Sequence, residues 1–450
     1  MDIGYWMSDI GSVLRRIFHL DEQNTDIRTE VLGGVTTFMT MAYIVFVNPQ
    51  ILSQTGMNFD AVMAATCLAA GLATWAMGLA ANYPIALAPG MGENLFFLTV
   101  VVGMGISWQV ALAAVFVSGL VFFLLTFLGI RELIIDSVPK NLKLAIAVGI
   151  GLFVAFIGLV GAGIVERGET GLLRLGDLTQ SPTVVACVGV VITAALLARR
   201  VKGAILIGIL ATFVLAWAAG IVEWQGLVAA PPSIAPTFLQ LDLPGLLDAA
   251  LIPVIIVFLF MAVFDAIGTL IGVSQQAGLL RDGKLPRATP ALLADSSGTV
   301  IGSLLGTSTV TAYIESSTGV QAGARTGLAN MVTGALFFLA LFFSPLVRMV
   351  GGGVSGESGA ILQPMTAPAL IIVGCLIAGC IQSIDWSDFT EAFPAFLVII
   401  GIPLSWSIAD GIAFGFIVYP ILKLLSGRGS EVPLLTYVLS AVFIARYLFL

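Results

Sequence analysis

Long apolar stretches almost free of charge are the feature that most constrains how this chain can fold. Of its 450 residues, 58% are hydrophobic and only 10% are charged, whereas an ordinary soluble domain is about a quarter charged. A water-soluble protein of this length could not bury so much apolar surface. At roughly 20 apolar residues per membrane-spanning helix, the composition leaves room for about a dozen spans. We therefore expect an all-α polytopic membrane protein, which argues against a soluble enzyme, a secreted disulfide scaffold and a nucleic-acid binder.

Polar breaks divide the chain into fourteen apolar segments and one further apolar helix. The predicted spans are 31–52, 61–81, 85–103, 107–129, 142–162, 183–199, 203–220, 247–273, 290–305, 309–322, 326–347, 366–383, 390–405 and 407–426, with the further helix at 432–449. The first 30 residues are mixed polar, so we expect no cleavable signal peptide there. Apolar residues recur in them at helical spacing, which predicts an amphipathic helix on the membrane surface. These residues are Ile10, Val13, Leu14, Ile17 and Phe18.

The basic residues set the expected orientation, because cytoplasmic loops are enriched in Lys and Arg. With the N-terminus inside, fifteen of the nineteen basic residues fall in cytoplasmic segments, and the predicted outside loop 221–246 contains none. The acidic loop at 384–391 does not contribute to this pattern. We therefore expect a multi-pass protein of the cell (inner or plasma) membrane with both termini in the cytoplasm.

Two of the fourteen segments cannot be continuous helices. The third, at 83–97, contains Pro84, Pro89, Gly90 and Gly92, and proline and glycine disfavour a helix interior. The tenth, at 306–319, carries a Thr/Val/Thr run that favours extended structure. Non-helical backbone at membrane depth must be buried in protein or line a cavity. We expect each segment to form a short strand followed by a half-helix, with the two strands paired.

These two broken segments occupy matching places in two halves of seven spans each. Glu93 and Glu315 stand at corresponding positions, and Phe38, Met41 and Ala42 match Phe258, Met261 and Ala262. Broken segments in corresponding positions of two odd-numbered halves indicate an inverted repeat and point to the binding site.

Of the 26 acidic residues, five lie well inside apolar runs: Glu93, Asp265, Asp295, Glu315 and Asp410. An ionisable group in a span is costly and is by default a functional hypothesis. Glu93 and Glu315 begin the two predicted half-helices, where a carboxylate either caps the helix or faces a cavity and bonds a substrate. Asn94 adds a donor and an acceptor, which suits a flat heterocycle that displays both.

Asp265 lies in mid-span without a basic residue within one helical turn, which suits a group that takes up and releases a proton. The alternative is an aspartate bonded to Ser or Thr of a neighbouring helix. Asp295 and Asp410 lie near span ends, and we favour a structural role for Asp295 and a helix cap for Asp410. Aromatic residues flank the acidic positions and either stack on a planar ligand or pack in the core: Phe96, Phe97, Phe264 and Tyr313. No metal-ligand cluster or catalytic set is evident, so we expect no cofactor, no metal and no enzyme activity.

At these positions the chain resembles the AzgA-like hypoxanthine/guanine permeases of the nucleobase–cation symporter family. The resemblance covers nearly the whole chain and rests on Thr29–Ile44 with Val47–Pro49, Ala86–Gly92 with Asn94, Phe264–Leu270, Gly306–Thr311 with Tyr313–Ser316, and Arg325–Gly327. It implies two inverted seven-span repeats in which a core domain moves against a gate domain, and it implies proton-coupled purine uptake. The fold analogy also suggests a homodimer.

Carried over residue by residue, Asn94 matches the family's third-span amide and Glu315 its tenth-span carboxylate. Asp265 matches the second of two eighth-span aspartates, whereas Ala262 stands where the first is found. The residue before Asn94, usually apolar, is Glu93 here. We hypothesise that the missing carboxylate has been relocated to Glu93.

The expected organisation follows. The domains are an N-terminus at 1–30, a first repeat at 31–220 (core 31–129, gate 142–220), an outside loop at 221–246, a second repeat at 247–426 (core 247–347, gate 366–426) and a C-terminal helix at 427–450.

The expected substrate-binding residues are Glu93, Asn94, Phe264, Asp265, Tyr313, Glu315 and Ser316, with Glu93, Asp265 and Glu315 coupling the proton. The expected partners are the lipid bilayer and a purine nucleobase of the hypoxanthine, guanine or adenine type, imported by proton symport with elevator-like alternating access. Alternatives are Na⁺ as the coupling ion, a non-purine heterocycle as the substrate, an anion (sulfate- or bicarbonate-type) transporter of the same fold, or a channel.

Overall fold

The computed structural model describes residues 12–129, 139–168, 173–247, 251–279, 285–356 and 361–449. Within these ranges, seven helical stretches are long and apolar enough to cross a membrane: α2–α3 (Ile27–Met41 and Ile44–Ser53), α4 (Phe59–Ala80), α6 (Trp108–Phe127), α8 (Lys140–Gly161), α9 (Ser181–Ala198), α11 (Ile252–Gln276) and α14–α15 (Gly327–Ala340 and Ser344–Gly351). The remaining helices are α5 (Met91–Met104), α10 (Ala204–Ala218), α12 (Ala288–Leu305), α13 (Ser316–Gln321), α16 (Ala367–Ala378), α17 (Phe389–Ser405), α18 (Ile408–Leu425) and α19 (Leu434–Phe449). Each of the fourteen predicted spans corresponds to one of these helices, a broken helix or a strand with its helix, and the expected fold class is confirmed.

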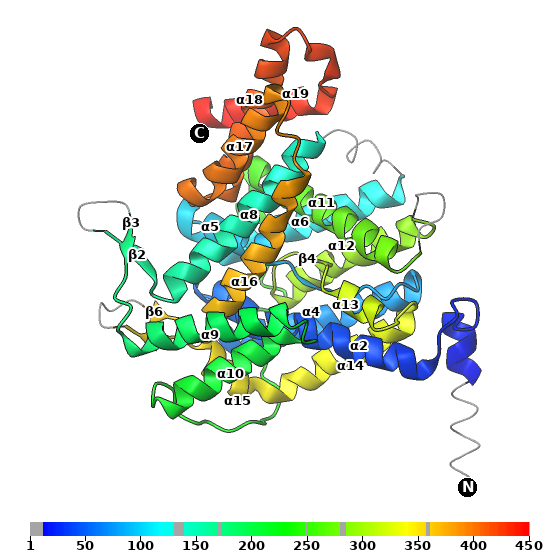
Figure 1. Ribbon diagram of the computed structural model, residues 1–450. Coiled ribbons are helices and arrows are strands. Elements are labelled where there is room, and N and C mark those ends of the chain that lie inside the picture. Colours follow the sequence, from blue (N-terminus) through cyan, green and yellow to red (C-terminus); the bar gives the residue numbers. More distant parts are fainter. Residues whose placement is uncertain are drawn as a thin grey trace.

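Three short antiparallel strand pairs join the helices. They are β1 (Leu87–Pro89) with β4 (Val310–Ala312), β2 (Val165–Arg167) with β3 (Leu173–Leu175), and β5 (Val354–Ser355) with β6 (Ile361–Leu362). The β1–β4 pair is the predicted one, with Leu87 opposite Ala312, Ala88 opposite Thr311 and Pro89 opposite Val310. Because β1 comes from the first half of the chain and β4 from the second, this pair joins the two halves at the centre of the molecule (Figure 1).

Side chains from neighbouring helices satisfy the outer edges of this buried strand pair. On β1, the Thr74 hydroxyl both donates to the Leu87 carbonyl and accepts from the Leu87 N–H, each at 2.9 Å. On β4, Thr299 donates to the Val310 carbonyl and Asp295 accepts from the Ala312 N–H, each at 2.8 Å. Backbone polar groups must find partners inside the protein at membrane depth. Asp295 therefore has the structural contact that the sequence favoured.

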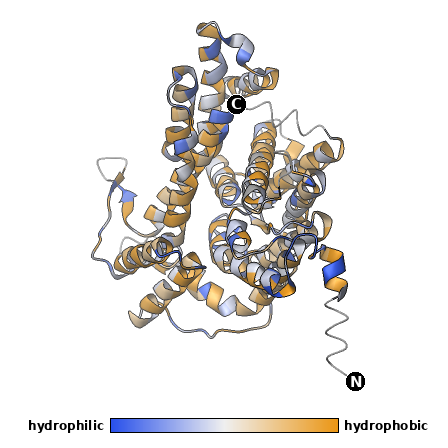
Figure 2. Cartoon of the chain, turned by 45° about the vertical axis from the view of Figure 1, so that its right-hand side comes forward, coloured by the Kyte–Doolittle hydropathy of each residue, from blue (hydrophilic) through white to orange (hydrophobic). Residues whose placement is uncertain are grey.

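The helices pack in two groups, which Figure 1 shows one beside the other. In the first, α4 and α6 pack on α12, α14 packs on α2 and α4, and α11 packs on α6. In the second, α8 packs on α16 and α17, α9 packs on α10 and α16, and α17 packs on α18. These groups contain the helices that the sequence assigns to core and gate, and the division into two moving bodies remains a prediction. Hydrophobic residues dominate these helices, while hydrophilic residues gather at a few helix ends (Figure 2).

Glycines allow the closest helix contacts of the first group. A Cβ added to Gly327 of α14 would collide with the backbone carbonyl of Gly78 in α4, and one added to Gly34 of α2 would collide with the carbonyl of Ala329. Small residues let helix backbones approach in this way where lipid supplies no hydrophobic drive for association. Glycine therefore allows close helix packing here, in addition to interrupting the third predicted span.

A charged cluster joins the ends of α17 and α18. The ammonium of Lys423, whose side chain is almost fully buried, lies 2.9 Å from Glu391 and 3.0 Å from Glu431. Arg428 bonds Asp388 at 2.7 Å and Glu431 at 2.8 Å. Together these residues hold the start of α17 against the end of α18.

After that cluster the chain turns back, and α19 packs on α18. The Phe416 and Phe443 rings lie 6.1 Å apart, and the Tyr447 hydroxyl donates to Asp410, in the first turn of α18, at 2.7 Å. The helix is therefore antiparallel to α18 over nearly its whole length.

The N-terminal segment is helical over residues 12–18, as its periodicity predicts. Phe18 and Leu20 pack on Leu328 of α14, whereas Val13 and Ile17 are exposed. Ile10, part of the same predicted stripe, lies outside the described residues. The loop after α10 continues through a 3-10 turn at Pro244–Leu247, and its Leu239 N–H donates to the Leu304 carbonyl of α12.

Candidate functional site

The antiparallel strand pair brings the starts of α5 and α13 together inside the helix bundle. Gly90, the residue before α5, donates its N–H to the Thr309 carbonyl, and Tyr313, just after β4, donates its N–H to the Ala86 carbonyl. Each strand is thus fixed on the other immediately before its half-helix begins. The side chains at the two helix starts consequently point into one shared region.

Glu315 stands at the N-cap position of α13 but makes no side-chain cap bond. Its carboxylate instead accepts from the hydroxyl of Tyr43, which lies between α2 and α3, at 2.8 Å. The bonded Glu315 is only half-buried, so part of it remains accessible. This geometry agrees with the substrate-facing interpretation of Glu315 rather than with a helix cap.

Glu93 is the third residue of α5 and is 2% exposed. Its carboxylate lies over the helix start, next to Gly90. A Cβ added to Gly90 would collide with it. It interacts electrostatically with Asp265 and Asp295. The absence of a side chain at Gly90 therefore leaves the space that this carboxylate occupies.

Asp265 lies midway along α11, and its side chain is exposed. It interacts electrostatically with Glu315, and Tyr313 interacts with Glu93, Asp265 and Glu315. The ion pairs found in the described part of the chain involve none of these carboxylates. Several like charges at membrane depth are costly without counter-charge, so this cluster is a place where a bound proton can reside.

Asn94 is completely buried beside Glu93. Its side-chain oxygen accepts from the Ser308 hydroxyl, whereas its amide nitrogen has no hydrogen-bond partner among the described residues. A buried donor without a partner is costly, so this nitrogen is suited to bonding an incoming acceptor. Ser316 accepts from the Ala86 N–H at 3.0 Å, which gives it a structural contact in addition to its expected role.

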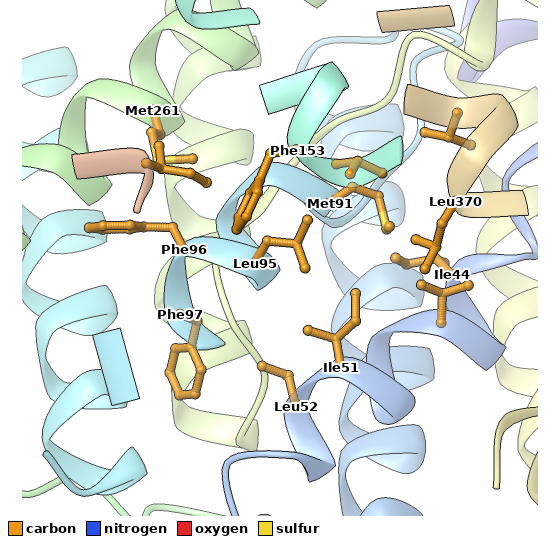
Figure 3. Close-up of a cluster of buried hydrophobic side chains, with 14 of the residues drawn as sticks. Ile44, Ile51, Leu52, Met91, Leu95, Phe96, Phe97, Phe153, Met261 and Leu370 are labelled. Carbon is orange, nitrogen blue, oxygen red and sulfur yellow. The ribbon is translucent and has the colours of Figure 1, made fainter. Parts of the chain in front are cut away.

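The aromatic residues divide between strand and core contacts. Tyr313 donates its hydroxyl to the Pro89 carbonyl. Phe96 lies edge-on to Phe258 of α11 with centroids 4.6 Å apart, while Phe97 is fully buried. Figure 3 shows Phe96 and Phe97 on different sides of α5, with Met261 beside Phe96. The side chain of Phe264 lies outside the described residues.

The structure thus brings Glu93, Asp265, Tyr313 and Glu315 into one cluster. Asp295 interacts with Glu93, in addition to the structural contact that the sequence favoured for it. Sequence reasoning did not single out Tyr43, although it lies in one of the stretches that carry the family resemblance. Asp410 does not cap α18, because Ser407 accepts the Asp410 N–H instead.

Sequence comparisons connect most of the chain to membrane permeases. The model of a family described as the Permease family matches residues 28–414. A putative permease, MJ0326, of Methanocaldococcus jannaschii is 50% identical, with 97% of this chain and 98% of the relative aligned. The guanine/hypoxanthine permease PbuG of Bacillus subtilis is 47% identical over 97% and 100%. The adenine permease AdeP of Escherichia coli is 43% identical over 97% and 96%.

Solved structures share the fold at much lower identity. The transmembrane domain of the cyanobacterial bicarbonate transporter BicA superposes with a TM-score of 0.62 at 15% identity, covering 85% of this chain and 97% of that one. SLC26A9 superposes with a TM-score of 0.59 at 9% identity, covering 93% and 70%. At these identities the likeness concerns the fold alone.

Proposed function

The chain belongs to the Permease family, and on that premise we propose that it imports a purine nucleobase together with a proton. It is a multi-pass membrane transporter and not an enzyme. The observation that carries the proposal is the cluster of Glu93, Asp265 and Glu315 beside the unpaired amide of Asn94, in a chain whose relatives are named guanine/hypoxanthine and adenine permeases.

A purine displays ring N–H donors and ring nitrogen or carbonyl acceptors along its edge. Glu315, held by Tyr43 at 2.8 Å, supplies an acceptor for such an N–H, and the Asn94 amide supplies a donor. Ser316 and the rings of Tyr313 and Phe264 complete the proposed binding set. Matching a polar edge in this way gives strong discrimination, because an analogue lacking one group leaves a buried partner unpaired.

The proton is proposed to reside on the carboxylate cluster. Asp265 is its accessible member, and Glu93 supplies the carboxylate that the family pattern places at Ala262. Inward movement of one charge through about 100 mV provides roughly 2.3 kcal/mol, enough for about fifty-fold accumulation. Na⁺ coupling is the alternative that the test below separates.

Alternating access is proposed to come from elevator-like sliding of the core helices against the gate helices, in a homodimer. We place the N-terminus in the cytoplasm, as the distribution of basic residues predicts. The same pattern predicts a cytoplasmic C-terminus. Because α19 returns along α18 as far as Asp410, we place its end at the opposite face instead.

An anion transporter is the second candidate, since two solved structures that share the fold are named a bicarbonate transporter and an anion transporter. Half-helix starts also favour anions through their free N–H groups. Three carboxylates in the same region oppose an anion electrostatically, so the nucleobase is the better substrate.

The test is competitive uptake in transporter-deficient cells. Radiolabelled hypoxanthine, guanine and adenine are offered at two pH values, with pyrimidines, sulfate and bicarbonate as competitors and with Na⁺ present or replaced. We expect a purine to be taken up faster at the lower pH, independently of Na⁺ and of both anions. Uptake inhibited by sulfate or bicarbonate but by no purine would overturn the proposal in favour of the anion carrier.

A further inference from the structure

A cavity of about 290 Å³ lies beyond the carboxylate cluster, between α5 and the turn that joins α17 to α18. One wall carries Phe96 and Gly103 of α5, and the other carries Trp406, Ser407 and Asp410. None of the three clustered carboxylates lines it. Phe96 lies one helical turn beyond Glu93, so the cavity begins next to the proposed substrate site.

The two walls come from different groups of helices. Phe96 is fixed edge-on against Phe258 of α11, at 4.6 Å between centroids. The Trp406 ring is held between two rings of α8, at 5.5 Å from Phe153 and 5.1 Å from Phe156, nearly perpendicular to both. Relative movement of the core and gate helices would therefore open or close this space.

Trp406 presents an aromatic ring to the cavity, and Asp410 presents a carboxylate. Trp406 has a left-handed backbone (φ 55°) at the turn, and although its ring is held, the residue is 47% exposed. The Asp410 carboxylate accepts from Tyr447 of α19 at 2.7 Å, and this bond orients it. A fixed aromatic face next to an oriented carboxylate can contact a flat ring and accept its N–H.

We infer that this cavity is an outer binding station for the same class of flat, N–H-bearing heterocycle, occupied before the substrate reaches the carboxylate cluster. The inference rests on the proposed function. At about 290 Å³ the cavity lies just below the usual range for small-molecule sites, roughly 300–1,000 Å³, so it suits no more than a single small ring system. Trp406 contacts a face of the ring, and Asp410 bonds its edge.

The decisive experiment reports on the cavity while the central site is disabled. Gly103→Cys is the reporter, because a Cβ added there meets no atom within 4 Å, and the four native cysteines are replaced by serine. Its alkylation by a membrane-impermeant maleimide is timed in intact cells, with and without the purine that competes best in the uptake panel. The background carries Glu315→Gln, which removes the carboxylate proposed to bond the substrate at the central site. We expect the purine to slow alkylation severalfold even in this background.

Two variants connect that protection to the proposed contacts. Trp406→Leu and Asp410→Asn should each abolish protection, and in otherwise wild-type protein each should raise the KM for uptake severalfold with less effect on the maximal rate. The matched control is Trp386→Leu, since Trp386 is 46% exposed but precedes α17 at its other end; protection and KM should not change. Each of the two substitutions tests the cavity contacts by itself, so the test needs only one variant that reaches the membrane.

The possible results distinguish a failure of the proposed function from a failure of the outer station alone. If wild-type protein imports no purine, the proposed function fails. If it imports a purine but Gly103→Cys is alkylated equally fast with and without that purine, or if protection disappears with Glu315→Gln, the outer station is overturned and the function stands. Protection that survives both Trp406→Leu and Asp410→Asn would equally overturn it.

Discussion

At the scale of single residues, the central site depends on carboxylates that form no ion pair among the described residues. Glu315 is bonded by Tyr43, Glu93 lies over the start of α5, and Asp265 is exposed. A base bound there meets acceptors on one side and the Asn94 amide on the other. Changes of charge and changes of hydrogen bonding should therefore have separable effects.

Glu93→Gln keeps the shape of the side chain and removes its charge. We expect proton-coupled uptake to fall by roughly ten- to hundredfold, since interactions with charged groups contribute about 1.5–3 kcal/mol. Uptake assays with matched surface expression measure this, and Glu223→Gln in the loop at 221–246 serves as the control. Transport at the wild-type rate would end the hypothesis that Glu93 replaces the carboxylate missing at Ala262.

Tyr43→Phe removes only the hydroxyl that bonds Glu315. We expect the KM for uptake to rise by about three- to tenfold with a smaller change in maximal rate, because a typical hydrogen bond contributes about 0.5–1.5 kcal/mol. The structure orients Glu315 through this bond, so substrate affinity should respond first. An unchanged KM would show that Glu315 needs no such support.

Much of this site could be predicted from the rarity of acidic residues in apolar runs. Glu93, Asp265 and Glu315 were selected in that way. Tyr43 was not, because a phenol in a span is not costly enough to attract notice, and only the fold shows that it reaches Glu315. The contact between Asp295 and the Ala312 N–H likewise depends on how α12 crosses β4, which no local pattern encodes.

At the scale of elements, the broken spans were predictable and the path of the last helix was not. Pro89, Gly90 and the Thr/Val/Thr run of β4 predict both strands and their pairing. The direction of α19 depends on the turn at residues 426–433 and on contacts such as Phe416 with Phe443. Apolar composition shows that a helix of this kind exists, but not along which neighbour it runs.

The contact of α4 with α14 gives a prediction about stability. Gly327→Ala places a Cβ against the backbone of Gly78, and overpacking of this kind costs about 1–3 kcal/mol. We expect a lower thermal midpoint in detergent, measured by fluorescence-detected size exclusion. Gly379→Ala is the control, because a Cβ there meets no atom within 4 Å. Equal midpoints for the two variants would contradict the close approach of these helices.

The antiparallel packing of α19 gives a prediction about topology. The end of α18 carries Lys423 and Arg428, which the charge pattern places in the cytoplasm. A reporter fused after residue 450 should therefore lie outside, whereas one inserted in the turn after Arg428 should lie inside. Paired alkaline phosphatase and green fluorescent protein fusions distinguish the two faces. A cytoplasmic reporter at both positions would mean that α19 does not cross the membrane.

At the scale of the whole molecule, proton coupling must be separated from the general effect of pH on the fold. Bonds from Arg428 and Lys423 lower the pKa of Glu431 to about 2, and bonds from Thr390 and Arg428 hold the pKa of Asp388 well below its usual range. A carboxylate with a lowered pKa stabilises the fold above its unfolded value, near 4, and loses that contribution as the pH falls through the folded value. The cluster at the ends of α17 and α18 should therefore be unaffected between pH 5 and 8.

We accordingly expect uptake to fall as the pH rises from 5 to 8 while this cluster contributes nothing to the change. Initial rates in proteoliposomes and thermal midpoints of the same protein across that range measure the two effects. If the midpoint decreased in parallel with the rate, the pH dependence would belong to the fold and not to proton coupling.

The β1–β4 pair also imposes a delay during synthesis, because its two strands are far apart in the sequence. Pro89 leaves the ribosome 224 residues before Tyr313, the residue that bonds its carbonyl. At about 5–20 residues per second, synthesis of that interval takes roughly 10–45 s. Throughout that time β1 is inside the membrane machinery without its partner strand. The first half must therefore be sheltered by the insertion apparatus until the second half arrives, and a chain truncated before β4 should be a substrate for membrane proteases rather than a stable half-transporter.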